Sequence, residues 1–328
     1  MQRNYIHLAL LMVFVLFLNS CKEEEYALPS PKTGLNNDCI KRTIGPNMVG
    51  LNLEFAYAMA VPQSEGSIVS ANVVASIAGA AGTYLENKSY YTNGSGQDIG
   101  IAIGDPSVTT DAKTEVVFTR DTCAATLRYY YKIPAEAIGS TVSFTFSATS
   151  SNGQTVTYKM GPYTVAKMDM ALDLAVKDND VSYISIENMT VYNATDAALN
   201  ADKIDLVYLY RSITGISFNH SLVAPATNPE YLPGITLPTG VSNDTKILKA
   251  WSLRDRHLAR LQYGVYIDDL DFEKLSFDAA SNFAINLKAE AGIWVGTANG
   301  KYKAYVYVNS VNNTTKSAVI SIKRYMVN

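Results

Sequence analysis

Residues 142–158 read VSFTFSATSSNGQTVTY, and this stretch decides the fold class. Apolar residues at every second position from Val142 to Ala148 alternate with serine and threonine, which is the period of a strand with one buried face. Asn152-Gly153 supplies the positive φ angles of a tight turn, and the strand pattern resumes at Thr155. The stretch therefore predicts a β-hairpin whose apolar face packs against a second sheet.

Strand-like stretches recur on both sides of this hairpin. Residues 50–59, 68–77, 114–119 and 124–133 carry the β-branched and aromatic residues of half-buried strands. Near the C-terminus, residues 305–322 repeat the hairpin pattern around Asn312-Asn313. Strands that follow one another at roughly ten-residue spacing are typical of an Ig-like sandwich. We therefore predict an all-β protein of two tandem Ig-like β-sandwich domains, the second with short helical insertions.

The boundaries follow from these patterns and from length. The chain has 328 residues, and we place the first sandwich at 45–167 and the second at 168–328. Within the second, residues 204–210 are apolar on both faces apart from Asp205, as in a central strand. The Pro-rich segment 222–249 predicts a long functional loop. Residues 251–261 predict a helix, and Thr195 is a candidate helix cap.

The N-terminal residues predict export and lipid attachment. An apolar run of about twelve residues after Arg3 is too short for the roughly twenty of a membrane-spanning helix, and fits a signal peptide at 1–20. Residues 18–21 read LNSC, which resembles the bacterial lipobox and makes Cys21 the acylated residue and the link to outer-membrane lipid. The alternative is an ordinary signal peptide with a chance cysteine.

Residues 21–44 read as the lipidated cysteine and a tether. The acidic run after Lys22 resembles the surface-export signal of Bacteroidetes lipoproteins, and it also suits a solvated tether. We therefore expect a lipid-anchored outer-membrane protein that faces the cell exterior.

Composition narrows the class of protein. The chain is 48% hydrophobic and 17% charged with a formal charge of −3, which excludes a disordered chain. There is no basic stripe, so we expect no nucleic-acid partner. Cys39 and Cys123 permit a disulfide, worth roughly 4–5 kcal/mol by loop-closure arithmetic. The alternative is two free thiols packed as small hydrophobes.

Several stretches resemble a Bacteroidetes surface lipoprotein family known only as a domain of unknown function. These stretches are residues 37–42, 83–86, 201–208 and 253–258. The resemblance spans nearly the whole mature chain and implies the location and the two-sandwich architecture, without an activity or catalytic residues. By looser analogy, lipoproteins of this kind with tandem sandwiches often sit beside glycan-import systems.

The motifs of catalysis and metal binding are missing from the sequence. His220 and His257 are far apart, without a Gly-x-Ser-x-Gly elbow or a Cys-x-x-Cys pair, and we interpret 254–257 as a structural ion-pair cluster. The acidic groups at 178–180 and 268–273 read as solvated turns. A glycoside hydrolase needs two facing carboxylates, and the 30 acidic residues single out no pair. We therefore expect no enzyme activity, metal or cofactor.

Aromatic residues supply the candidate binding sites. The chain has 22 tyrosines and two tryptophans, and aromatic rings stack on the apolar C–H faces of sugars. The candidates are Tyr90, Tyr91 and Asn93 before a Gly-rich turn, and Trp251 and Trp294; the alternative for each ring is a place in the core. Our hypothesis is a non-enzymatic surface protein that binds extracellular polysaccharide as an accessory to nutrient uptake. The alternatives are a structural or adhesive subunit with a surface protein partner, and a glycoside hydrolase.

Overall fold

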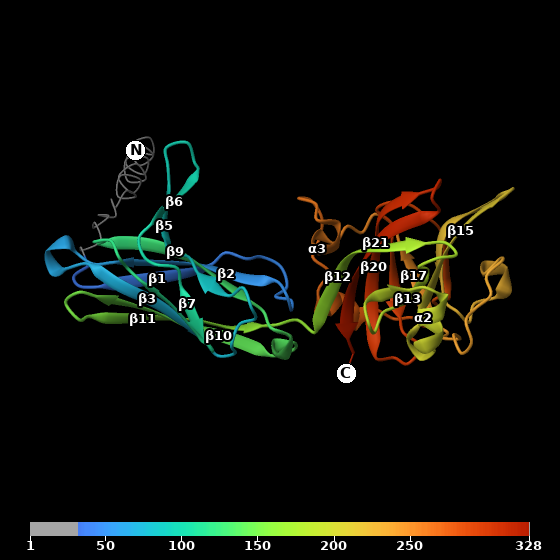
Figure 1. Ribbon diagram of the computed structural model, residues 1–328, viewed down its shortest axis with the longest axis horizontal. Helices are drawn as coiled ribbons and strands as arrows, with labels where there is room; N and C mark the ends of the chain where they lie inside the picture. The colour runs from blue at the N-terminus through green and yellow to red at the C-terminus, as the bar shows by residue number, and fades with distance from the viewer. Residues whose placement is uncertain (1–31, 328) are drawn as a thin grey trace, which may run out of the picture. The chain divides into compact units, whose positions relative to one another are not determined.

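Two β-sandwiches in series account for residues 35–327 of the chain, and the computed structural model describes residues 32–327 (Figure 1). Every pair of neighbouring strands is antiparallel. The predicted all-β fold of tandem sandwiches is therefore confirmed. The predicted signal peptide, Cys21 and most of the predicted tether lie outside the described residues. In residues 32–327, no helix has the length and apolar character that crossing a bilayer requires.

The first sandwich packs a four-stranded sheet on a five-stranded sheet. The first sheet has the order β1 (Asn36–Lys41), β2 (Asn52–Ala60), β9 (Ala124–Lys132) and β4 (Tyr84–Leu85). The second has the order β11 (Thr155–Thr164), β10 (Thr141–Ser150), β3 (Ile68–Ala75), β8 (Lys113–Val117) and β7 (Val108–Thr110). Aromatic rings fill the space between them, and the rings of Phe55 and Phe144 lie 4.8 Å apart.

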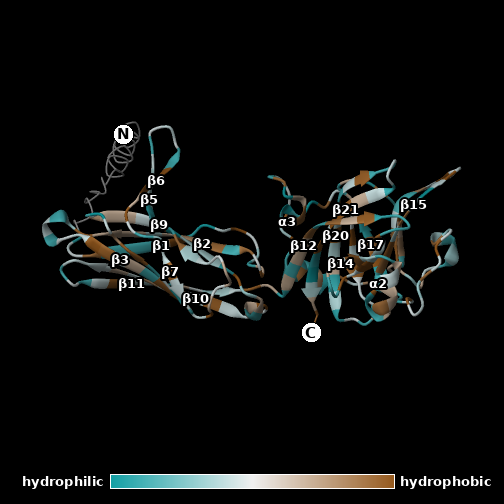
Figure 2. Ribbon diagram, in the orientation of Figure 1, coloured by the Kyte–Doolittle hydropathy of each residue, from teal (hydrophilic) through white to brown (hydrophobic). Residues whose placement is uncertain are grey.

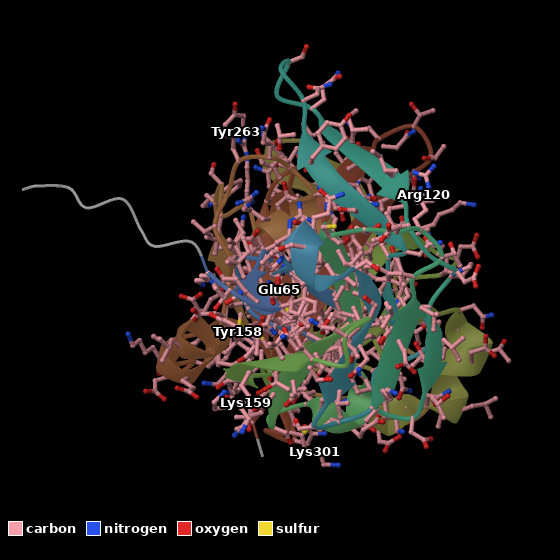
Figure 3. The ribbon with its side chains drawn as sticks, turned by 90° about the vertical axis from the view of Figure 1, so that its left-hand side faces the viewer. Glu65, Arg120, Tyr158, Lys159, Tyr263 and Lys301 are labelled. Carbon is pink, nitrogen blue, oxygen red and sulfur yellow. The ribbon has the colours of Figure 1, made fainter. Side chains whose placement is uncertain are left out.

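The hairpin predicted from residues 142–158 is confirmed as β10 and β11. Phe146 lies opposite Tyr158, and Gly153 takes a φ of +83° in the turn. Along β10 every second residue from Val142 is buried, which gives the alternating colours of such strands in Figure 2. Tyr158 and Lys159 are neighbours on β11 (Figure 3), where Tyr158 packs against the core and Lys159 is exposed.

A separate hairpin projects from the first sandwich. It is formed by β5 (Lys88–Thr92) and β6 (Asp98–Ala102), which pair only with each other (Figure 1). The backbone leading into β5 runs beside β9, since Glu86 N donates to Arg128 O. Short 3₁₀ turns at Gln63–Glu65 and Ala135–Ala137 complete this sandwich.

The second sandwich contains two five-stranded sheets. One has the order β12 (Met168–Lys177), β21 (Ser317–Met326), β20 (Tyr302–Asn312), β19 (Gly292–Gly296) and β17 (Lys246–Ala250). The other has the order β14 (Thr190–Tyr192), β13 (Tyr183–Ser185), β15 (Leu206–Ile213), β16 (Ile216–Val223) and β18 (Phe283–Leu287). The stretch predicted as a central strand is β15, which lies in the middle of its sheet.

Short helices decorate the second sandwich. They are α2 (Ala194–Leu199), α3 (Arg256–Ala259) and α4 (Asp269–Lys274), with 3₁₀ turns at Ala201–Lys203 and Pro229–Tyr231.

Three local predictions in the second sandwich need correction. The helix expected at 251–261 shrinks to α3, because Arg260 adopts a left-handed φ of 51° that ends it. Asn193, rather than Thr195, caps α2 by accepting from Asp196 N. The acidic residues expected in a solvated turn at 268–273 instead start α4, where Asp268 and Asp271 form a capping box.

The disulfide that the sequence permits is also corrected. Cys39 and Cys123 are free thiols. Cys39 lies opposite Tyr57 of β2, which in turn lies opposite Leu127 of β9. Cys123 precedes Leu127 by four residues. The two cysteines are thus separated by β2 and by about 13 Å along the strand direction, beyond the roughly 7 Å between Cα atoms that a disulfide spans.

Candidate functional site

The outer face of the first sheet carries a row of aromatic and charged side chains. In β9, the residues Leu127, Tyr129 and Tyr131 are buried in the core. Strand alternation turns Arg128 and Tyr130 to the opposite, outer face. This row is the starting point of the candidate site.

Two tyrosines stack across the edge of this sheet. Tyr84 of β4 pairs directly with Tyr130 of β9, and their rings lie 4.9 Å apart with planes inclined by 16°. Tyr84 remains 41% exposed, so the pair presents aromatic surface to solvent. Burial of its hydroxyl end, followed by the nearby Glu86 carboxylate, raises the pKa of Tyr84, so the phenol remains a neutral donor.

Arg128 lies between the stacked pair and the projecting hairpin. Its guanidinium lies 3.7 Å from the centre of the Tyr90 ring and forms an ion pair with Asp98 of β6. Gly100, directly opposite Tyr90, makes this packing possible, because a Cβ there would lie 2.9 Å from the Tyr90 ring. Tyr90 therefore holds Arg128 in place and is not itself a free stacking surface.

Glu86 adds an acceptor beside these rings. Its Oε2 is buried and has no hydrogen-bond partner among residues 32–327. Burial, followed by the neighbouring Glu86 carboxylate, raises the pKa of Tyr90 to about 12. We call Tyr84, Tyr90, Arg128 and Tyr130, with Glu86 and Asp98, the tyrosine–arginine face.

The strand next to the tyrosine–arginine face, β2, carries two alanines on its outer face and Glu54 directly opposite Tyr130. Ala56 of β2 lies opposite Arg128, and Ala58 lies opposite Thr126. Methyl groups rise less from a sheet than tyrosine or arginine side chains do. A flat ligand can therefore lie over Ala56 and Ala58 with its edge against Arg128, flanked by Glu54 opposite Tyr130.

The structure brings only one sequence-predicted residue into this face. Tyr90 belongs to it, whereas Tyr91 alternates to the other side of β5 and is 52% exposed. Asn93 is occupied in the hairpin turn, where its Oδ1 accepts from Ser95 N and Gln97 N. Tyr84, Arg128 and Tyr130 were not predicted. The alternation of buried and outward-facing residues within 124–132 indicates that Arg128 and Tyr130 share one face. It does not reveal that Tyr84 pairs with Tyr130.

The two tryptophans of the second sandwich differ in role. Trp294 lies in β19 and packs against Phe272 and Tyr305, with ring centres 5.4 and 4.7 Å away, so it belongs to the core. Trp251 is 58% exposed, and Lys249 Nζ lies 4.5 Å from the centre of its ring. Only Trp251 is therefore available to a partner.

A buried ion pair lies behind the short helix α3. Asp255 Oδ2 and Lys323 Nζ are 2.5 Å apart, and both side chains are fully buried. Asp255 also accepts from the backbone N–H groups of His257, Leu258 and Ile267. The structural ion-pair cluster expected at 254–257 is thus present, with Lys323 as the cation.

Both described histidines are held in structural networks. His257 Nδ1 lies 3.3 Å from Lys323 Nζ; burial, followed by this ammonium, lowers the pKa of His257 to about 4. His220 contacts Tyr208 Oη at 2.6 Å and Asn313 Oδ1 at 2.7 Å, and burial lowers its pKa. Across residues 32–327, three or more His, Cys, Asp or Glu side chains nowhere gather in a way that could hold a metal ion.

Comparisons with known proteins agree with this architecture of two β-sandwiches. The domain of unknown function DUF4466 matches residues 32–165, and the domain of unknown function DUF8576 matches residues 166–327. A crystal structure of a DUF4466 family protein from Parabacteroides merdae is 47% identical, with a TM-score of 0.84, and the match covers 90% of this chain and 100% of that chain. The chain belongs to the DUF4466 family.

More distant comparisons add nothing further. The major pilin subunit of Bacillus cereus shares 8% identity over 48% of this chain and 50% of its own, with a TM-score of 0.28, too low to support an argument. Among curated proteins, none matches this chain.

Proposed function

We propose that this protein is a lipid-anchored outer-membrane protein, exposed on the cell surface, that binds extracellular glycan without catalysing a reaction. Binding takes place at the tyrosine–arginine face and serves nutrient uptake. The observation that carries the proposal is the exposed stacked pair, Tyr84 and Tyr130, beside a fixed arginine. The C–H faces of a pyranose ring stack on such rings, while polar groups at the rim meet its hydroxyls.

The charges of this face favour a neutral glycan. Arg128 is already paired with Asp98, which neutralises its charge. The carboxylates of Glu86, beside Tyr90, and Glu54, opposite Tyr130, repel an anionic ligand. A neutral, hydroxyl-rich polysaccharide therefore fits better than a uronate or a sulfated chain.

The anchor is supported by the sequence of the first 21 residues. The short apolar run, the LNSC boundary at 18–21 and the acidic run after Lys22 together suit acylation of Cys21 and export to the surface. Metabolic labelling with a fatty-acid analogue tests this directly. The label is expected on the wild type and should be lost in Cys21→Ser; label retained by that variant would contradict the anchor.

Affinity electrophoresis through gels that contain neutral polysaccharides tests glycan binding. Tyr84→Ala and Tyr130→Ala are expected to weaken retention about ten-fold or more, the size of effect seen for aromatic residues at the centre of an interface. Tyr91→Ala removes an exposed ring from the same region and should change little. Free migration of the wild type in every such gel, or equal losses in all three variants, would refute this site.

A second candidate function is an adhesive or structural subunit, favoured by one exposed segment. Residues 251–266 of the second sandwich expose Trp251 and Tyr263, the latter 78% exposed and pointing outward in Figure 3. Trp and Tyr are enriched where proteins dock. Cross-linking on intact cells would distinguish the two functions, since a protein partner should be captured by the wild type and lost in Trp251→Ala with Tyr263→Ala.

A further inference from the structure

The second sandwich has a polar surface pocket that is separate from the tyrosine–arginine face. Its volume is about 380 Å³, and its lining includes Asn179, Asp180, Ser182, Tyr183, Thr195 and Ile235. It is formed by the turn before β13, by the start of α2 and by the loop that follows Pro229–Tyr231. The volume lies at the lower end of the range for small-molecule sites, roughly 300–1,000 Å³.

Two largely buried residues line this pocket and carry hydroxyls without a protein partner. Ser182 is only 2% exposed and Tyr183 only 5% exposed. Neither side-chain hydroxyl forms a hydrogen bond within residues 32–327, although the backbone of Ser182 bonds to Tyr192 and Tyr208. Neither hydroxyl is among the fully buried, unpartnered polar atoms of residues 32–327, so both keep access to the pocket and are free to bond a ligand there.

The walls of the pocket are held in place by the surrounding backbone. Tyr183 lies in β13 between Tyr192 of β14 and Val207 of β15. Asn193 uses its side chain to cap α2 through Asp196 N, which fixes the entry of that helix. The hydroxyls therefore keep their positions when the pocket is empty, and binding costs little side-chain ordering.

The chemistry of the lining selects among ligands. It offers hydroxyl and amide groups together with the apolar side chain of Ile235. Asp180 contributes a carboxylate, and its partner Lys177, with Nζ and Oδ2 3.2 Å apart, is not among the lining residues. A carboxylate at the wall disfavours an anionic ligand, while hydroxyl-rich ligands can donate to it.

We propose that this pocket binds a single neutral sugar residue, such as the terminal unit of a glycan. The inference rests on the proposed function for its ligand class, but it places a second site on a different sandwich. The ligand's hydroxyls bond to Ser182, Tyr183 and Asp180, and its apolar ring face packs on Ile235.

Saturation-transfer NMR on the full-length chain tests this site. The probes are glucose, galactose, mannose and N-acetylglucosamine, with glucuronic acid as the anionic counterpart. At least one neutral sugar is expected to give signals and glucuronic acid none. Ala194→Trp, at an exposed lining position, should fill the pocket and abolish the signals. Tyr183→Phe removes only a hydroxyl and should weaken binding by up to about ten-fold, the net worth of one neutral hydrogen bond.

Matched controls separate this site from the first one. Tyr192 lies opposite Tyr183, and its hydroxyl accepts from Asn188 outside the pocket. Tyr192→Phe should therefore leave the signals unchanged. Tyr84→Ala should also leave them unchanged. The inference would be overturned if no sugar gave saturation-transfer signals, or if the signals survived in Ala194→Trp. It would also be overturned if the signals were lost in Tyr84→Ala but not in the pocket variants. Polysaccharide retention that survives Tyr84→Ala would instead count against the proposed function.

Discussion

The two sandwiches differ in the polar and charged residues that their interiors contain. In the first, the buried polar residues are Thr83, Thr114 and Ser150, and the described core contains no charged side chain. In the second, Asp178, Asp205, Asp255, His220 and Lys323 are all buried. In the first sandwich the longest connection between strands, 42–51, has ten residues, and aromatic packing fills the interior. The second must also fix the long connections from β16 to β17 and from β17 to β18, and buried polar groups hold parts of them.

Asp255 and Lys323 illustrate how this is done. Asp255 lies in the connection between β17 and β18, and Lys323 lies in β21 of the sheet. Lys323 Nζ also donates to Ile267 O at 3.1 Å, so one ammonium fastens two points of the same connection. A pair of this kind costs desolvation energy but fixes one arrangement of the chain.

The largest expected effect follows from removing this cation. Lys323→Met keeps the length of the side chain but leaves the Asp255 carboxylate buried without its counter-charge, and should destabilise the second sandwich by roughly 3–5 kcal/mol. Urea unfolding followed by tryptophan fluorescence measures this selectively, because both tryptophans of the chain, Trp251 and Trp294, lie in the second sandwich.

The matched control is the double variant Lys323→Met with Asp255→Asn. It removes both charges while the amide oxygen can still accept from the backbone, so it should recover most of the lost stability. The first sandwich, followed by the exposure of its buried Cys39 on unfolding, should not shift in either variant. A loss below about 1 kcal/mol in the single variant, typical of exposed pairs, would show that this pair does not hold the connection.

A smaller effect, of opposite sign, is expected at Asp205. This carboxylate accepts from Ile186 N at 2.8 Å and has no cation partner among residues 32–327. Burial raises its pKa from 3.8 to about 7. Because the folded state holds the proton more tightly than the unfolded chain, the stability gained from protonation is full below pH 3.8 and is lost as pH rises through about 7.

Asp205→Asn removes this pH dependence. Well above the raised pKa the variant should be more stable than the wild type by up to about 4 kcal/mol, from about 1.4 kcal/mol for each of the roughly three units of pKa shift, and the gain should vanish below about pH 4. The measurement is the urea midpoint across this pH range, with Asp278→Asn, an exposed aspartate, as the control. A gain that is equal at both ends of the range would disprove the assigned cause.

The sandwich fold was predictable because local patterns determine it. Alternation in 142–148 and the Asn-Gly turn are signals that neighbouring residues supply by themselves, and they gave β10 and β11 correctly. The helix predicted over 251–261 was wrong because apolar spacing there imitates a helix, while Asp255 is drawn inward to Lys323 and the chain turns at Arg260. That bond joins residues far apart in sequence.

The candidate site was predictable only in part for the same reason. Tyr90 was found from its place before a Gly-rich turn, but its role as a support for Arg128 depends on Gly100 and on the packing of the hairpin beside β9. The stacking of Tyr84 on Tyr130 depends on strand register across 46 positions of sequence, from 84 to 130. Composition cannot indicate such a pairing. It also could not distinguish Trp294 from Trp251 as a candidate, although Trp294 packs against the core.

The smallest expected effect concerns the cysteines of the first sandwich. Burial, followed by Asp38, raises the pKa of Cys39 to about 12, so its reactive thiolate is scarce. Cys123 is only half-buried, with Sγ 3.7 Å from Gly66 O. Iodoacetamide should therefore modify Cys123 in the folded protein and Cys39 only after denaturation, as peptide mass spectrometry would show. Since the two thiols lie on either side of β2, reductant should leave the melting temperature unchanged. A cross-linked peptide containing both cysteines would contradict the strand register that separates them.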